Sequence, residues 1–214
     1  MPLANQVDIK TIGKLTNKRK SILNIDIAYK DEGQGEVIFC LPPWPNGSTA
    51  FTPFIHALKN SYRIIALDLP GWAGYSDDMP ILPTVENYTL IIEEFILSFG
   101  VKEYNLLGYS FGGVFVQTTL ERGNVHPKKL VFVSTLHSGN EINNNFHALL
   151  NLYKIATKFR LALGIRAYVF ERQFRAVKIV GNSYYKKYLR TAFYKQVIKE
   201  RARAKIDKIF GAMF

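Results

Sequence analysis

The chain has 214 residues, of which 48% are apolar and 21% charged, and this composition excludes disordered, collagen-like and coiled-coil proteins. Its one cysteine, Cys40, excludes an internal disulfide framework and favours a reducing compartment, which we take to be the cytoplasm. The first residues lack the basic stretch and apolar core of a signal peptide, and no apolar run reaches the ~18 residues that span a bilayer. We therefore expect a globular, cytoplasmic protein.

The net charge of +11 is distributed unevenly along the chain. Residues 1–150 hold 12 Lys and Arg against 14 Asp and Glu, whereas residues 151–214 hold 16 against 3. The chain thus combines a near-neutral body with a strongly basic C-terminal section that is rich in Tyr and Phe. It shows no repeat at a solenoid period and no low-complexity tract.

Taken in chain order, residues 21–29 alternate between apolar and polar, with Ile25 and Ile27 on one face, and this pattern predicts an antiparallel edge strand. Residues 31–35 then predict a turn. Four later runs lack such alternation, as central strands of a parallel sheet do when helices cover both faces. These runs are residues 37–41, 63–67, 104–107 and 130–133.

Helical patterns separate the predicted strands. Residues 85–99 repeat apolar side chains at the spacing of one helix face, with Thr84 as N-cap and Gly100 at the end. Residues 111–122 are apolar nearly all round and predict a buried helix that stops at Gly123. This alternation predicts an α/β protein with a mostly parallel sheet and flanking helices. From about residue 143 only helical patterns remain, at residues 144–157, 161–174 and 184–210.

The most specific local pattern is Gly-Tyr-Ser-Phe-Gly-Gly at residues 108–113, which directly follows a predicted strand and opens the predicted buried helix. Gly108 and Gly112, two positions before and after Ser110, let the strand and the helix approach without a Cβ clash. Such a turn lifts the Ser110 hydroxyl above the carboxyl edge of the sheet and leaves backbone N–H groups facing it. The pattern favours a nucleophilic serine over a structural glycine-rich turn.

Two segments ahead of this serine extend the pattern. They are Leu-Pro-Pro-Trp-Pro-Asn-Gly-Ser at residues 41–48 and Asp-Leu-Pro-Gly-Trp-Ala-Gly-Tyr-Ser at residues 68–76. In their order and separation, these segments and the serine turn resemble the α/β-hydrolase family across residues 21–137.

The resemblance implies an α/β-hydrolase fold and a role for each matching residue. Ser110 would be the nucleophile, and the backbone N–H groups of Phe111 and Trp44 would form the oxyanion hole. Residues 1–137 would form the hydrolase core and residues 138–214 a helical, basic cap.

The first loop and the second segment depart from the family pattern. Family members usually carry His-Gly where this chain has Pro42-Pro43, and two prolines remove two N–H donors. Trp44 keeps its own N–H. The segment that begins at Asp68 includes Ala73, or one extra residue, relative to the family spacing, which we interpret as a loop variation.

The largest departure from the family pattern concerns the catalytic base. A serine hydroxyl is a poor nucleophile without a base in hydrogen-bond reach. The family places its acid and histidine after the serine, on loops that follow later strands. This chain has His126, His137 and His147 after Ser110. We interpret His126 as a surface loop residue and His147 as an exposed residue of a cap helix.

His137 is the one possible base, because it follows the predicted strand at residues 130–133 and so lies at the correct edge of the sheet. Glu141 is its nearest acid, and the resemblance supports neither role. No further strand is predicted before Phe214. We therefore expect the last strands of the fold to be missing, as in a fragment or a truncated product.

Other polar residues have simpler interpretations. Asp68 precedes Pro-Gly and is typical of a turn-forming or loop-anchoring residue rather than a triad acid. His56 reads as a surface residue of a helix, and Cys40 as a small buried hydrophobic residue. No cluster has metal-ligand spacing, and no phosphate-binding glycine motif is present, so we expect neither a metal nor a cofactor.

The basic section allows a different function. Across residues 184–208, Lys and Arg alternate with Tyr and Phe, a combination found on surfaces that bind nucleic acid or anionic membranes. The favoured interpretation is an amphipathic cap helix with solvated charges, and we do not expect a nucleic-acid partner. The charge would bias the site toward anionic substrates or lipid surfaces.

The leading hypothesis is a serine-dependent hydrolase that cleaves an ester or related acyl bond in a small, partly hydrophobic molecule. The same scaffold hosts transferases, dehalogenases and perhydrolases, so the fold does not define the reaction. Dehalogenation fits least, because it uses an aspartate where this chain has Ser110. The alternative hypothesis is a binding or interaction module that keeps the scaffold without catalysis, or a truncated product that lacks its catalytic histidine and acid.

Overall fold

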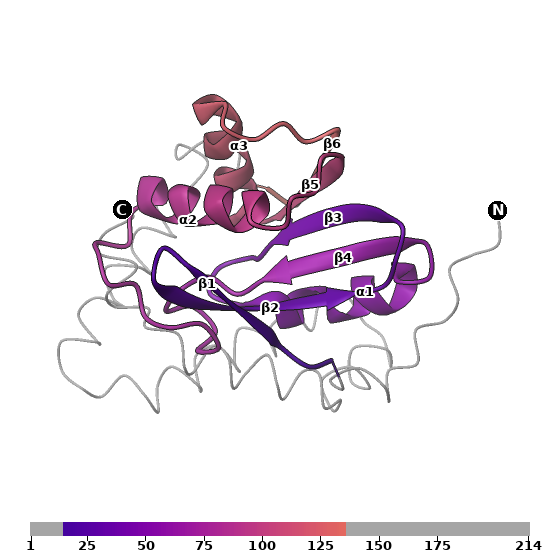
Figure 1. Cartoon of the computed structure of the whole chain (residues 1–214), viewed down its shortest axis with the longest axis horizontal. Helices are drawn as coiled ribbons and strands as arrows, with labels where there is room; N and C mark the ends of the chain where they lie inside the picture. The colour runs from indigo at the N-terminus through magenta and orange to yellow at the C-terminus, as the bar shows by residue number, and fades with distance from the viewer. Residues whose placement is uncertain (1–14, 136–214) are drawn as a thin grey trace, which may run out of the picture.

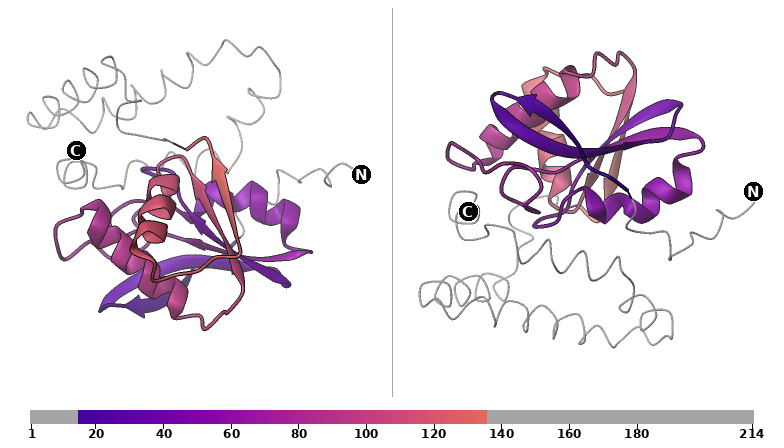
Figure 2. Two further views of the ribbon diagram at one scale, coloured as in Figure 1. Left: turned by 90° about the horizontal axis from the view of Figure 1, so that it is seen from above. Right: turned by 60° about the horizontal axis from the view of Figure 1, so that its bottom comes forward.

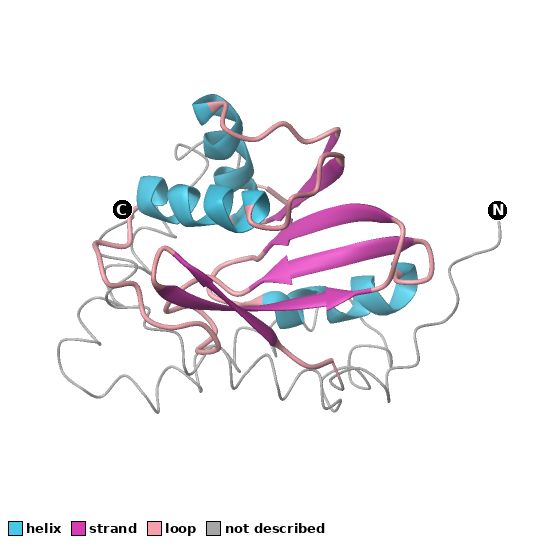
Figure 3. Ribbon diagram, viewed as in Figure 1, coloured by secondary structure: helices cyan, strands magenta, loops and turns pink. Residues whose placement is uncertain are grey.

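The computed structural model describes residues 15–135, which form a six-stranded sheet with helices on both faces (Figures 1 and 3). The strands, in chain order, are β1 (Lys18–Ile22), β2 (Ile25–Glu32), β3 (Glu36–Leu41), β4 (Tyr62–Leu67), β5 (Tyr104–Tyr109) and β6 (Lys129–Val133). The helices are η1 (Ser48–Phe51, a 3₁₀ turn), α1 (Thr52–Leu58), α2 (Val85–Leu97) and α3 (Gly112–Arg122). The four parallel strands predicted from apolar runs are all present.

The sheet order is β1-β2-β4-β3-β5-β6, and it is antiparallel on one side and parallel on the other. β2 pairs antiparallel with β1 and β4, whereas β3 pairs parallel with β4 and β5, and β5 pairs parallel with β6. The carboxyl ends of β3, β4, β5 and β6 therefore meet at one edge of the sheet. The predicted α/β class with a mostly parallel sheet is confirmed.

The segment at residues 21–29 was predicted as one edge strand, and this prediction is wrong in two respects. The segment contains a tight turn at Leu23 and Asn24, with φ of 50° and 63°, so that β1 and β2 form a hairpin. Two central residues with positive φ are typical of a hairpin turn whose twist matches its strands. β2 is consequently an interior strand, and β1 forms the edge.

Both faces of the sheet are buried, by separate groups of side chains. Successive residues of β3 point to opposite faces, so that Phe39 packs with the residues of α2 and α3, and Cys40 packs with those of η1 and α1. Both side chains are at most 1% exposed. In both views of Figure 2 the sheet lies between α1 and the α2–α3 pair.

The two longer helices begin and end as their sequences predict. Thr84 caps α2 by accepting a hydrogen bond from the N–H of Asn87 at 3.2 Å. Gly100 has φ of 62° just after α2, and Gly123 has φ of 71° at the end of α3. In both places a left-handed residue stops the helix, where glycine has no Cβ to strain. Between residues 15 and 135, no helix is long and apolar enough to cross a membrane.

The last strand differs from its prediction as a covered central strand. β6 is the edge strand of the described sheet, and Leu130, Val131, Phe132 and Val133 are 40–45% exposed. Its apolar run is therefore not buried by any residue between 15 and 135. The predicted cap at residues 138–214, with its basic segment 184–208, lies outside the described residues.

Candidate active site

The course of the chain reverses its winding direction at the carboxyl edge of the sheet, between β3 and β5. After β3 the chain continues into η1 and α1 on one face, whereas after the neighbouring β5 it enters α3 on the opposite face. Two adjacent parallel strands whose connections leave to opposite faces open a crevice between their carboxyl ends, where α/β proteins bind ligands. The two segments at this crevice are residues 42–47, which we call the first loop, and the turn that contains Ser110.

Ser110 occupies the connection between β5 and α3 with a backbone that is unusual for its residue type. Its φ is +52°, in the left-handed region that non-glycine residues rarely adopt. Its N–H donates to the carbonyl of Val133 at 2.8 Å, and its carbonyl accepts from the N–H of Gly113 at 3.0 Å. The backbone groups of Ser110 are thus tied to β6 and to the start of α3, and the serine is half-buried.

Three glycines allow the strand and the helix to come this close. A Cβ at Gly108 would lie 2.5 Å from the Cα of Gly113, closer than real Cβ atoms approach other atoms. A Cβ at Gly112 would collide with the backbone carbonyl of Leu41, at the end of β3. A Cβ at Gly113 would collide with the side chain of Thr135. At Gly108 and Gly112 the absence of a Cβ thus permits the close approach of α3 to β5 and to the end of β3.

The first loop begins directly beside this turn. Leu41 pairs with Gly108 in the parallel register, and the carbonyl of Pro42 lies against Gly112. Trp44 follows two residues later and is half-buried, and its peptide bond to Pro45 is cis. The structure therefore brings the start of the first loop, at Leu41 and Pro42, to the start of α3.

Aromatic side chains surround the start of α3. The ring of Phe111 lies 6.1 Å from that of Trp72 and 5.4 Å from that of Phe115, and Trp72 also contacts Tyr88. Trp72 and Phe115 are fully buried. Burial raises the pKa of the Tyr88 phenol, whose hydroxyl donates to the carbonyl of Pro70 at 2.8 Å. Phe111 therefore extends the core up to the serine turn.

Asp68 follows β4 at the same edge, and its carboxylate anchors the end of the first loop. One carboxylate oxygen accepts a hydrogen bond from the N–H of Ser48 at 2.6 Å, and the other accepts one from the Ser48 hydroxyl at 2.8 Å. Both residues are fully buried. This agrees with the interpretation of Asp68 as a loop-anchoring residue. The partner, Ser48, was not predicted, because no local pattern connects two residues that are 20 positions apart.

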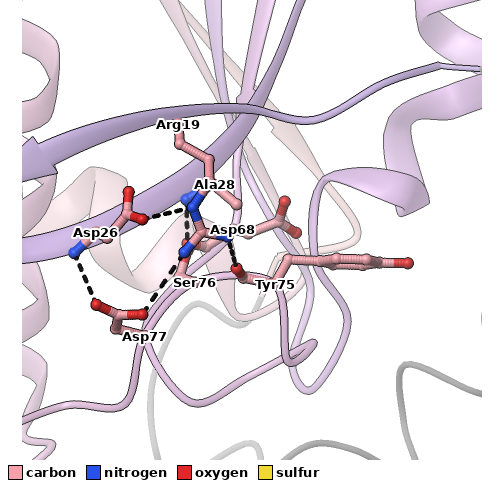
Figure 4. Close-up of polar contacts among 7 residues, drawn as sticks. All are labelled: Arg19, Asp26, Ala28, Asp68, Tyr75, Ser76 and Asp77. Atoms are coloured by element: carbon pink, nitrogen blue, oxygen red, sulfur yellow. Dashed lines mark hydrogen bonds and ion pairs between the residues drawn. The ribbon is translucent and has the colours of Figure 1, made fainter.

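The backbone of Asp68 is held in turn by the β1–β2 hairpin, as Figure 4 shows. Its N–H donates to the carbonyl of Ala28 at 2.9 Å, and the hydroxyl of Ser76 donates to its carbonyl and accepts from the N–H of Ala28. Next to this bridge, Arg19 contacts Asp77 and donates to the carbonyl of Tyr75 at 2.7 Å. The segment at residues 68–77 is therefore fastened to two strands.

Neither histidine of the described residues lies at this crevice. His126 is exposed, as predicted, and precedes β6, so it lies at the opposite edge of the sheet from Ser110. His56 lies on α1 and is half-buried rather than at the surface, and burial together with nearby Lys59 lowers its pKa. His56 is thus less exposed than a fully solvated surface residue, while the buried residues of α1 are Thr52 and Ile55. His137 and His147 lie outside the described residues.

The remaining candidates for chemistry lie away from the crevice. Cys40 is completely buried in β3, as expected for a small hydrophobic residue, and burial raises the pKa of its thiol. Among residues 15–135, no three His, Cys, Asp or Glu side chains gather in a way that could hold a metal ion.

The order of these parts is that of a known family. Residues 36–179 match the family model described as alpha/beta hydrolase fold, which is more than half of the chain. The chain belongs to this family. The structural elements agree with it, since the strand, the strained serine and the helix follow one another at the carboxyl edge of a sheet covered on both faces.

Several solved structures resemble this member of the family in fold. The epoxide hydrolase CorEH is 16% identical with a TM-score of 0.61, and the match covers 93% of this chain and 77% of that one. DBJA is 17% identical with a TM-score of 0.61, over 92% and 69% of the two chains. The N-acyl homoserine lactonase AidH is 20% identical with a TM-score of 0.55, over 62% and 49%.

These similarities define the fold and not the reaction, because all three identities are low. The chain spans about half the length of the lactonase and between two thirds and four fifths of the other two proteins. A comparison with curated protein sequences finds no match.

Proposed function

We propose that this protein is a serine-dependent hydrolase that cleaves an ester or related acyl bond in a small molecule. Ser110 is the nucleophile, and the N–H groups of Phe111 and Trp44 bind the oxyanion. The observation that carries this proposal is the φ of +52° at Ser110, between β5 and α3. Strained backbone costs free energy and concentrates at functional sites. A residue that only connected the two elements could be glycine, without that strain.

The kind of acyl bond follows from the nucleophile and from the surroundings. A serine forms an ester with an acyl group, whereas dehalogenation by the related enzymes uses an aspartate at this place. One similar structure is named a lactonase, and a lactone is a cyclic ester. The half-buried aromatic residues Tyr109 and Trp44 flank the serine turn and favour a partly hydrophobic substrate.

The proposed reaction runs through an acyl-enzyme. The Oγ of Ser110 attacks the carbonyl carbon of the substrate and gives its proton to a base, while the carbonyl oxygen becomes an oxyanion. The tetrahedral intermediate collapses, the bond to the alcohol breaks, and the alcohol takes the proton. A water molecule then attacks the acyl-enzyme by the same steps and releases the acid and Ser110. Two N–H groups aimed at the oxyanion lower both barriers.

His137 is the base that we propose within this chain. β6 runs parallel to β5, so the chain leaves β6 after Val133 at the edge where Ser110 lies. His137 comes four residues after this strand end. Of the two histidines within the described residues, His126 precedes β6 and His56 lies on α1, so both are worse candidates.

The proposal is tested by turnover of p-nitrophenyl esters of increasing acyl length by the full chain. We expect release of p-nitrophenol that is abolished in Ser110→Ala and reduced by about 10²-fold or more in His137→Gln, because the base is then missing. His126→Gln is the matched control and should keep the wild-type rate. Turnover that persists in Ser110→Ala would refute the role of this serine.

A binding module without catalysis is the second candidate, and the first loop favours it. Pro42 and Pro43 remove two N–H groups where an oxyanion hole needs donors. Such a module would bind an ester or its product without turnover. Isothermal titration calorimetry with an ester tests this second function. It would be established if wild type binds the ester without hydrolysing it and Ser110→Ala binds it equally well.

A further inference from the structure

Asp68 is a buried carboxylate that the proposed reaction does not use. It is 0% exposed, and burial of a charged group is costly unless hydrogen bonds compensate for it. Two such bonds come from one residue, Ser48, through its N–H and its hydroxyl. Ser48 is therefore held more firmly than ordinary loop packing requires.

Ser48 directly follows the first loop, so that its position determines where this loop ends. The contact is close, because a Cβ at Gly47 would collide with the carboxylate of Asp68 and would lie 2.7 Å from the Cβ of Ala73. The other end of the loop is fixed by β3 and by the contact of Pro42 with Gly112. Trp44 lies between these two fixed ends.

We infer that Asp68, acting through Ser48, is a positioning residue that holds the first loop and the N–H of Trp44 beside Ser110. Asp68 is itself fixed, because its N–H and carbonyl are joined to β2 through Ala28 and Ser76 (Figure 4). The hairpin thus holds Asp68 in place, Asp68 holds Ser48, and Ser48 holds the end of the first loop. The effect of this support on catalysis rests on the proposed function, whereas its effect on the loop does not.

The loop can be observed directly, because the chain has two tryptophans. Trp72 is 0% exposed, whereas Trp44 is half-buried, so quenching of fluorescence by acrylamide reports mainly on Trp44. We would compare the full chain with Ser48→Ala and Asp68→Asn. Thr52→Val is the matched control, because it also removes a buried hydroxyl nearby, and this hydroxyl has no hydrogen-bond partner among the described residues.

We expect Ser48→Ala and Asp68→Asn to raise the quenching constant clearly above wild type, with Thr52→Val unchanged and circular dichroism equal in all variants. Equal quenching in Ser48→Ala and Thr52→Val would overturn the inference, whether or not Ser110 is catalytic. If Asp68→Asn does not fold, Ser48→Ala alone decides between these outcomes.

The catalytic part is measured by the split between kcat and KM for a p-nitrophenyl ester. A misplaced oxyanion donor weakens binding of the transition state and not of the substrate. We expect Ser48→Ala to lower kcat about tenfold with KM nearly unchanged. This is less than the loss of a whole oxyanion-hole donor, which lowers kcat by about 10²–10³-fold. Wild-type kcat in Ser48→Ala would overturn the catalytic part. Absence of turnover in wild type would instead refute the proposed function and leave the loop measurement as the test.

Discussion

At the scale of single residues, the serine turn depends on glycine, because its close contacts leave no room for a Cβ atom. Gly112 can lie directly against the end of β3 only because it lacks a side chain. A Cβ there would collide with the backbone carbonyl of Leu41. Backbone cannot move aside as the end of a flexible side chain can. The close approach of α3 to β3 is what brings Ser110 and the first loop to the same crevice.

Substitution of Gly112 by alanine should therefore destabilise the fold by about 2–3 kcal/mol, as overpacking does in a tight core. Gly123→Ala is the control, because Gly123 has a φ of 71° and nothing within 4 Å of a built Cβ. Its cost should be only about 1 kcal/mol, from backbone strain. Urea denaturation of both variants measures the difference. Equal losses would show that the contact with Leu41 is not tight.

The residues of the crevice differ in how far sequence could predict them. The turn at Ser110 was predictable, because Gly-x-Ser-x-Gly directly after an apolar strand is a local pattern. The contact between Ser48 and Asp68 was not, because it depends on β3 and β4 being neighbours and joins residues 20 positions apart. The half-buried state of His56 likewise results from the packing of α1 and not from its own sequence.

At the scale of elements, ion pairs fasten the antiparallel side of the sheet. Arg63 of β4 binds Asp31 of β2 through two bonds of 2.8 and 2.9 Å, and Lys18 of β1 adds a third at 3.1 Å. Burial alone would raise the pKa of Asp31, but the bonds from Arg63 and Lys18 outweigh it and lower this pKa below its usual value of 3.8. Three strands thus share one carboxylate.

This lowered pKa predicts a dependence of stability on pH. A carboxyl group with a depressed pKa in the folded state stabilises the fold fully above its unfolded pKa and loses this contribution as pH falls through the folded value. Asp31→Asn should therefore cost about 1–2 kcal/mol at neutral pH. The difference from wild type should shrink as pH falls below about 4. Urea denaturation as a function of pH measures it, and a difference that stays constant down to pH ~2 would contradict the assignment.

Elements with a clear local sequence pattern were predictable, whereas the N-terminal hairpin was not. β3, β4 and β5 were predicted because a strand buried on both faces is apolar throughout. The hairpin at Leu23 and Asn24 was missed because its turn lacks glycine and its flanking residues alternate as one strand would.

At the scale of the whole molecule, the described sheet ends in an apolar edge strand. Four consecutive residues of β6 are 40–45% exposed, so both faces of the strand are uncovered within residues 15–135. Natural proteins usually protect such edges with charges, bulges or covering elements, because an apolar edge pairs readily with other chains. Figure 1 shows β6 beyond β5, at the end of the sheet opposite β1.

A charge on this edge should therefore reduce self-association of the full chain. We expect Val131→Lys to lower the weight-average mass measured by sedimentation velocity at high protein concentration. Leu97→Lys is the control, because Leu97 is also exposed, at 51%, but lies on α2 and offers no strand edge. The prediction fails if both variants lower association equally, or if neither does.

The central claim is that Ser110 is a nucleophile, and covalent labelling tests it most directly. The full chain would be incubated with a fluorophosphonate, and the adduct would be located by mass spectrometry of the intact protein and of its peptides. We predict one adduct per chain, on Ser110, which is absent in Ser110→Ala and present in Thr52→Val. A wild-type chain that forms no adduct, or an adduct that persists in Ser110→Ala, would contradict the claim.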